Sequence, residues 1–73
     1  MNKVLIKMSN GEYLKSWQYC QGYEDFVTTT NIFEAKDFST LNIAMVGKFQ
    51  PEAEVVEVHF DAQVLNTKPI TEV

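Results

Sequence analysis

Residues 31–50 read NIFEAKDFSTLNIAMVGKFQ and decide the fold, because they form a helical stretch between segments that otherwise have strand character. Asn31 and Glu34 have the spacing of a capping box, with Asn in place of the usual Ser or Thr, and this spacing predicts a short helical turn. Ser39 or Thr40 is then placed to cap a second, longer helix. We therefore expect two helical segments in this stretch.

The longer helix is expected to cover one face of a β-sheet. Its side chains at helical spacing predict an amphipathic helix, and these are Leu41, Ala44, Met45, Lys48 and Phe49. Gly47 and Pro51 mark where the helix weakens and stops. The layer that closes the sheet is expected to consist of Ala35, Phe38, Leu41, Met45 and Phe49.

Two strand segments, residues 4–8 and 13–19, flank the dipeptide Asn10-Gly11. Type I′ hairpin turns prefer this dipeptide because both central residues need positive φ. If it forms a two-residue loop, Met8 lies opposite Tyr13. That register predicts one apolar face, made of Val4, Ile6, Met8, Tyr13 and Trp17 with Lys15 as an exception, and one half-solvated face, made of Leu5, Lys7, Leu14 and Ser16.

The remaining strands follow from β-branched, aromatic and alternating residues. Residues 26–30 predict a third strand, and residues 54–65 alternate for longer than any other segment. Twelve residues would span roughly 40 Å, so we expect part of this last strand to overhang, to bend at Asp61-Ala62, or to pair with another molecule. The β-β-β-α-β order predicts a small antiparallel sheet with one helix layer on one face, an α+β fold. Residues 1–66 are expected to form a single domain, and residues 67–73 a flexible C-terminal tail.

Charge limits the classes of partner. The 73 residues carry a net charge of −4 and no arginine. Three lysines against one glutamate leave the first 20 residues at +2, and three lysines against nine acids leave the rest at −6. Direct binding of nucleic acid is disfavoured, because basic residues supply most of the non-specific affinity. A protein partner is expected, with a basic, nucleic-acid-binding protein as one option.

Cysteine usage and hydropathy indicate the compartment. Cys20 is the only cysteine, so an intrachain disulfide and a multi-cysteine zinc site are excluded. No segment approaches the length of a membrane span, and the N-terminal apolar run is too short for a signal peptide. We expect a cytoplasmic protein, in the cytoplasm of a bacterial host, that does not bind a membrane.

Catalytic and cofactor motifs are weak. His59 is the only histidine, and Glu57 and Asp61 fall on its strand face at i−2 and i+2. With Glu52 or Glu54, these residues are the candidate metal ligands. One chain supplies too little imidazole or thiolate for a zinc site. A metal site shared between the two chains of a dimer remains an alternative. The three glycines are isolated and form no phosphate-binding loop. We expect no enzyme activity and no cofactor.

Two surfaces are candidates for partner binding. Tyr13, Trp17 and Phe26 are expected in the core, whereas Tyr19 and Tyr23 flank Gly22 in a presumed loop and are expected to be exposed. The acids of the last connection and strand form either a solvated edge or a mimic of nucleic acid. The candidate binding residues are Tyr19, Tyr23, Glu54, Glu57, His59 and Asp61.

A resemblance adds context. The segments VLIKMSNGEYLKSW and FVTTTNIFEAKDF, followed by a helix and a final Val/Glu strand, resemble short uncharacterised accessory proteins encoded by phages and prophages of Gram-positive bacteria. The shared order is a threonine strand, Thr28 to Thr30, then Ala35-Lys36-Asp37-Phe38, then the helix. This resemblance implies a small protein that binds and modulates a host or phage protein.

Other functions stay open beside this one. The first alternative is a homodimeric structural or regulatory module assembled through the long C-terminal strand or through the aromatic face of the hairpin. The second is an acidic mimic of nucleic acid that inhibits a nucleic-acid-binding protein. A small hydrolase that uses His59 is the third.

Overall fold

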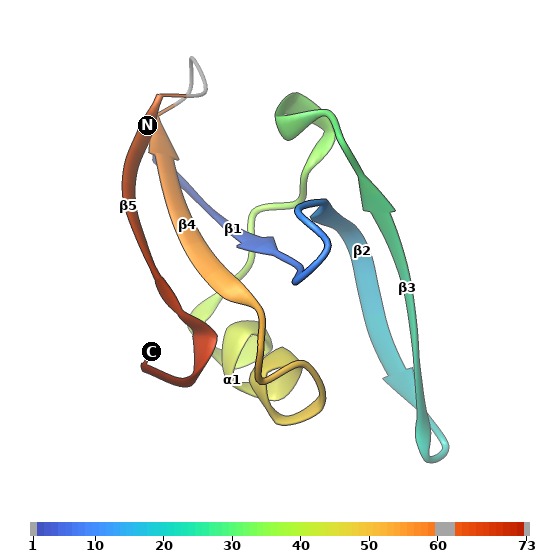
Figure 1. The fold of residues 1–73 in the computed structure, drawn as a ribbon. Helices are drawn as coiled ribbons and strands as arrows, with labels where there is room; N and C mark the ends of the chain where they lie inside the picture. The colour runs from blue at the N-terminus through green and yellow to red at the C-terminus, as the bar shows by residue number, and fades with distance from the viewer. Residues whose placement is uncertain (1, 60–62, 73) are drawn as a thin grey trace.

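The computed structural model describes residues 2–59 and 63–72, and these residues form one antiparallel sheet with one α-helix (Figure 1). The strands are β1 (Asn2–Lys7), β2 (Tyr13–Cys20), β3 (Tyr23–Thr29), β4 (Glu54–His59) and β5 (Val64–Pro69), with α1 (Thr40–Phe49) and the 3-10 turns η1 (Ile32–Glu34) and η2 (Ile70–Glu72). The strand order across the sheet is β3-β2-β1-β4-β5. The α+β class is confirmed, and within the described ranges the sheet gains a fifth strand.

Both predicted helix starts are present. The Asn31 side chain accepts a hydrogen bond from the Phe33 N–H and its amide donates to Glu34 at 3.1 Å, which closes η1. Ser39, rather than Thr40, caps α1 and accepts from the Asn42 N–H at 3.3 Å. Unpaired amides at a helix start need such acceptors, so these side chains fix where each helical segment begins.

The first hairpin differs from the predicted type I′ turn by one residue of register. Lys7, not Met8, pairs with Tyr13. The Met8 N–H donates to the Glu12 carbonyl at 2.7 Å, and the Gly11 N–H donates to the Met8 carbonyl at 2.9 Å. Gly11 alone takes positive φ, at 90°, so the loop has three residues and ends in a glycine bulge.

This shift of register places Leu14 and Tyr13 on the faces of the sheet opposite to those predicted. Leu14 is fully buried under the helix, although it was expected on the half-solvated face, and half-buried Tyr13 packs on the opposite face with Leu5. A bulge at Lys15, where β2 has one residue more than β3, then returns Trp17 to the face of Leu14. Lys15, the one charged residue on the predicted apolar face, is therefore the residue that forms the bulge.

The type I′ geometry occurs instead in the second hairpin. Gln21 and Gly22 take φ of 49° and 96°, and Cys20 pairs with Tyr23 across this two-residue loop. Both central residues of a type I′ turn need positive φ, which a glycine adopts without strain. Figure 1 shows β2 and β3 diverging from β1 as they run to this turn.

The segment between η1 and α1 passes through the sheet where β1 and β2 separate. The Lys36 N–H donates to the Leu14 carbonyl at 3.1 Å, and the Phe38 N–H donates to the Val4 carbonyl at 2.9 Å. Asp37 accepts from the Val4 N–H at 2.9 Å. These bonds pair the Leu14 carbonyl and both backbone groups of Val4, which the adjacent strand leaves without a partner at this point.

Two small cores lie on opposite faces of the sheet because of this crossing. One lies under α1 and contains Ile6, Met8, Leu14, Trp17, Phe38, Ile43, Val46, Ala53, Val55 and Ile70. The other lies under η1 and contains Leu5, Ala35, Val56 and Val58. Ala35 and Phe38 are buried as predicted, but in different cores, one on each side of the sheet.

The predicted long last strand is folded back on itself. β4 is an internal strand with buried side chains on both faces, so Val55 lies under α1 and Val56 packs on the opposite face. The predicted bend at Asp61-Ala62 lies outside the described residues. β5 pairs with β4 from Val64 to Pro69, so residues 67–69 belong to the sheet rather than to a flexible tail.

The end of the chain is anchored by Ile70. Its side chain is buried in the core under α1, and its N–H donates to the Ala53 carbonyl at 3.0 Å. The predicted C-terminal tail has little apolar pattern in its sequence, but the burial of Ile70 alone holds this segment against the core. Across residues 2–59 and 63–72, no helix has the length and hydropathy needed to cross a membrane.

Candidate functional site

The outer side of α1 carries an apolar surface that the sequence pattern assigned to the core. Leu41 is 80% exposed, Met45 41% and Phe49 40%, and Ala44 between them is also exposed. We call these four residues the α1 stripe. They follow one another at i, i+3, i+4 and i+8, so they lie on one side of the helix, which Lys48 shares.

α1 buries its other side. Ile43 and Val46 are buried against the sheet, and a side-chain carbon placed on Gly47 would lie 3.4 Å from Ile70 Cγ1. The helix is apolar on both sides, so helical spacing alone could not choose between them. The missed signal is Lys48, whose charge falls within the predicted stripe, whereas the buried side carries no charge.

Tyr19 extends the α1 stripe onto the β2–β3 hairpin. Its ring centroid lies 4.8 Å from that of Phe49, and the Trp17 and Phe49 centroids are 5.9 Å apart. Tyr19 is 43% exposed, as expected of a residue next to the hairpin turn. The aromatic contacts join the helix end to the hairpin, and such ring pairs add stability beyond their buried area.

A glutamate holds this junction in place. The Glu24 carboxylate accepts from the Trp17 indole N–H and from the Gln50 side-chain amide, each at 2.6 Å. Glu24 belongs to β3, Trp17 to β2, and Gln50 caps the C-terminus of α1. Hydrogen bonds to a charged acceptor are the stronger kind, so Glu24 fixes the position of the hairpin against the helix.

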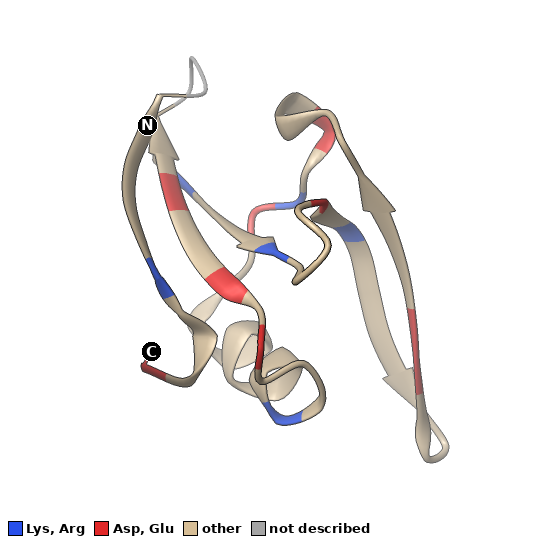
Figure 2. Cartoon of the chain, viewed as in Figure 1, with Lys and Arg blue, Asp and Glu red and all other residues tan. Residues whose placement is uncertain are grey.

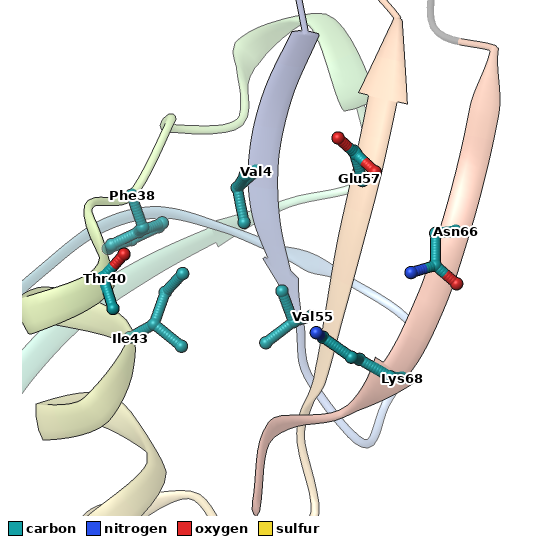
Figure 3. Close-up of a pocket in the computed structure, with 8 residues that line it drawn as sticks. All are labelled: Val4, Phe38, Thr40, Ile43, Val55, Glu57, Asn66 and Lys68. Atoms are coloured by element: carbon teal, nitrogen blue, oxygen red, sulfur yellow. The ribbon is translucent and has the colours of Figure 1, made fainter. Parts of the chain in front are cut away.

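A hollow of about 230 Å³ opens between the start of α1 and the sheet (Figure 3). Figure 3 shows Val4, Ile43 and Val55 pointing toward one another, with Lys68 reaching across from β5. The other lining residues are Phe38, Thr40, Glu57 and Asn66. Ligand pockets usually enclose about 300–1,000 Å³, so this hollow is smaller than a usual ligand pocket.

The acids of β4 do not form one carboxylate array. Glu54 lies opposite Lys7 on β1, and Glu57 lies opposite Val4, so the two acids are on opposite faces of the sheet. Glu57 lines the hollow together with Lys68 of β5. Figure 2 shows the acids of β4 flanked by lysines on both neighbouring strands, and this mixture of signs weakens the case for a nucleic-acid mimic.

The other candidate residues are dispersed. Tyr23 is 69% exposed, but it pairs with Cys20 and therefore projects from the face opposite to Tyr19. His59 is half-buried at the end of β4, where its backbone N–H donates to the Gln63 carbonyl at 2.8 Å. Alternation puts it on the face of Glu57, whereas Asp61 lies outside the described residues. Phe26, which was expected in the core, is 38% exposed on β3.

Within the described ranges, no three His, Cys, Asp or Glu side chains are grouped in a way that could hold a metal ion. Comparison with known proteins adds no assignment. No protein-family model matches the chain, and no curated protein or solved structure is significantly similar to it.

Proposed function

We propose that this chain is a small non-enzymatic binding protein that contacts a protein partner through the α1 stripe and Tyr19. The observation that carries the proposal is the exposure of Leu41, Met45 and Phe49 on a helix that already buries its opposite side. An exposed apolar surface of this kind on a small domain is typical of a protein-interaction site.

The residue types suit recognition of a polypeptide. Tyrosine, phenylalanine and methionine are enriched in the buried centres of protein interfaces. Met45 lies in the middle of the α1 stripe, and its unbranched side chain adapts to the shape of a partner. Tyr19 offers an apolar ring with a hydroxyl that can stay hydrated at the rim.

Charge selects the partner. The chain carries a net charge of −4, and Glu52 is exposed just beyond the end of α1. Lys48 is the only charged residue of α1. A segment with apolar anchors flanked by lysine or arginine complements this surface and is steered toward it. In the context that the phage resemblance implies, the partner is a basic host or phage protein whose activity is modulated.

Affinity capture with matched variants tests the proposal. Tagged wild-type protein is compared with Met45→Glu and with Phe33→Glu, using a lysate of a Gram-positive bacterium. Phe33 is a suitable control because it is 66% exposed in η1, away from the α1 stripe. Circular dichroism establishes that each variant is folded.

The expected result is a basic protein retained by the wild type and by Phe33→Glu but lost from Met45→Glu. Its retention should also weaken as salt is raised from about 50 mM to about 500 mM, since steering charges are screened. Equal retention by Met45→Glu, or no protein that distinguishes the variants, would overturn the proposal.

A further inference from the structure

The two outer strands of the sheet differ in how well their open edges are protected. β3 and β5 end the strand order, so within the described residues neither has a neighbour on its outer side. β5 contains Lys68 and Pro69, and a register irregularity interrupts its pairing with β4. Lysine, proline and bulges are the usual devices that prevent an edge from pairing with another chain.

β3 lacks lysine and proline, and its only charged residues are Glu24 and Asp25. Its sequence is YEDFVTT, seven residues without lysine or proline, and the bulge in its hairpin lies on β2. Aromatic and β-branched residues favour strands, and Phe26 and Val27 expose apolar surface on the two faces. β3 is therefore an open, pairing-competent edge.

We infer that a second copy of this chain pairs with β3 in antiparallel orientation, centred on Phe26. Cys20 and Tyr23 close a two-residue hairpin loop, so Tyr23 directs its backbone groups to β2. Alternate residues then turn their N–H and C=O groups outward, and these are Glu24, Phe26 and Thr28. Three such positions on each chain supply about six intermolecular hydrogen bonds.

Charge complementarity selects this arrangement. With Phe26 opposite Phe26 of the second copy, Glu24 lies opposite Thr28 and Asp25 opposite Val27. The two adjacent acids of one chain therefore avoid those of the other. A parallel arrangement places like acids next to each other, which destabilises a sheet. The Glu24 carboxylate is also turned toward Trp17 and Gln50 of its own chain, away from the edge.

This pairing changes the dimer expected from the sequence. The expected contact was the long C-terminal strand or the aromatic face of the hairpin, but β4 is internal and β5 is protected, so the open edge is β3. Two sheets joined along β3 form one continuous sheet. The α1 stripe takes no part in this backbone pairing, so dimerisation and partner binding can be tested separately.

Charge substitution at the symmetry position tests the inference. Sedimentation equilibrium between about 10 μM and about 1 mM measures the mass, because a dimer of this kind depends on concentration. The wild type should reach twice the mass of one chain. Phe26→Lys alone and Phe26→Glu alone should stay monomeric, and an equal mixture of the two should form a heterodimer. Leu65→Lys on the β5 edge is the matched control and should dimerise like the wild type.

A second measurement needs no variant. Hydrogen exchange of the backbone amides of Glu24, Phe26 and Thr28 should slow by about tenfold or more across the same concentration range, because pairing protects them. A wild type that stays monomeric at about 1 mM, a dimer unaffected by Phe26→Lys, or unchanged exchange at these three amides in the dimer overturns the inference.

Discussion

Replacing Ile70 with alanine measures how strongly the end of the chain is held. Ile70 is 4% exposed and packs against the core under α1. The substitution removes three carbon atoms, which is roughly 2.4 kcal/mol at about 0.8 kcal/mol per buried group. The remaining cavity adds to this, so the free energy of unfolding should fall by roughly 2.5–4 kcal/mol.

This loss is large for so small a domain. At about 0.05–0.15 kcal/mol per residue, the whole chain has a stability of roughly 4–11 kcal/mol. The melting temperature should therefore fall by roughly 10–30 °C. Urea denaturation followed by Trp17 fluorescence and by far-ultraviolet circular dichroism measures both quantities.

The matched control is Leu65→Ala, a truncation of a half-exposed residue on β5. It should cost less than about 1 kcal/mol, because little buried surface is lost. If Ile70→Ala changes the stability as little as Leu65→Ala does, residues 70–72 do not pack against α1 and the account of the C-terminus is wrong.

Two further substitutions test contacts around α1. Glu24→Ala removes the acceptor of the Trp17 indole and should lower the free energy of unfolding by roughly 1–3 kcal/mol. Asp25→Ala should change it by less than about 0.5 kcal/mol, and equal effects in urea denaturation would refute the role of Glu24. Gly47→Ala should raise the stability by roughly 0.5–1 kcal/mol, because alanine favours helix and its side chain meets Ile70 at an ordinary contact distance. Gly47→Leu should lower the stability, and thermal denaturation that shows the reverse order would contradict this packing.

Local signals in the sequence predicted the helix boundaries and the fold class. Asn31 and Ser39 cap their segments because each supplies an acceptor for a specific amide, which depends only on nearby residues. The alternating and β-branched segments predicted strands for the same reason. The α+β order follows from these elements, whereas the separation of residues 54–69 into two strands was not predicted.

Register and burial depended on residues far apart in the chain. Asn10-Gly11 is compatible with loops of two or three residues, and burial of Leu14 under α1 goes with the three-residue loop. The side of α1 that faces the sheet is set by Ile70 against Gly47, a contact across 23 positions that helical spacing does not reveal. The candidate surface was missed because it was assigned to the core.

The central claim is that α1 turns Leu41, Met45 and Phe49 outward as a recognition surface. Comparing the unfolding free energies of Met45→Glu and Val46→Glu tests it most directly, because the two residues are adjacent but Met45 is 41% exposed and Val46 is fully buried. Met45→Glu should stay within about 1 kcal/mol of the wild type. Val46→Glu buries an unpaired carboxylate and should lose more than about 4 kcal/mol or fail to fold. A folded Val46→Glu beside an unfolded Met45→Glu would place the stripe in the core and contradict the account.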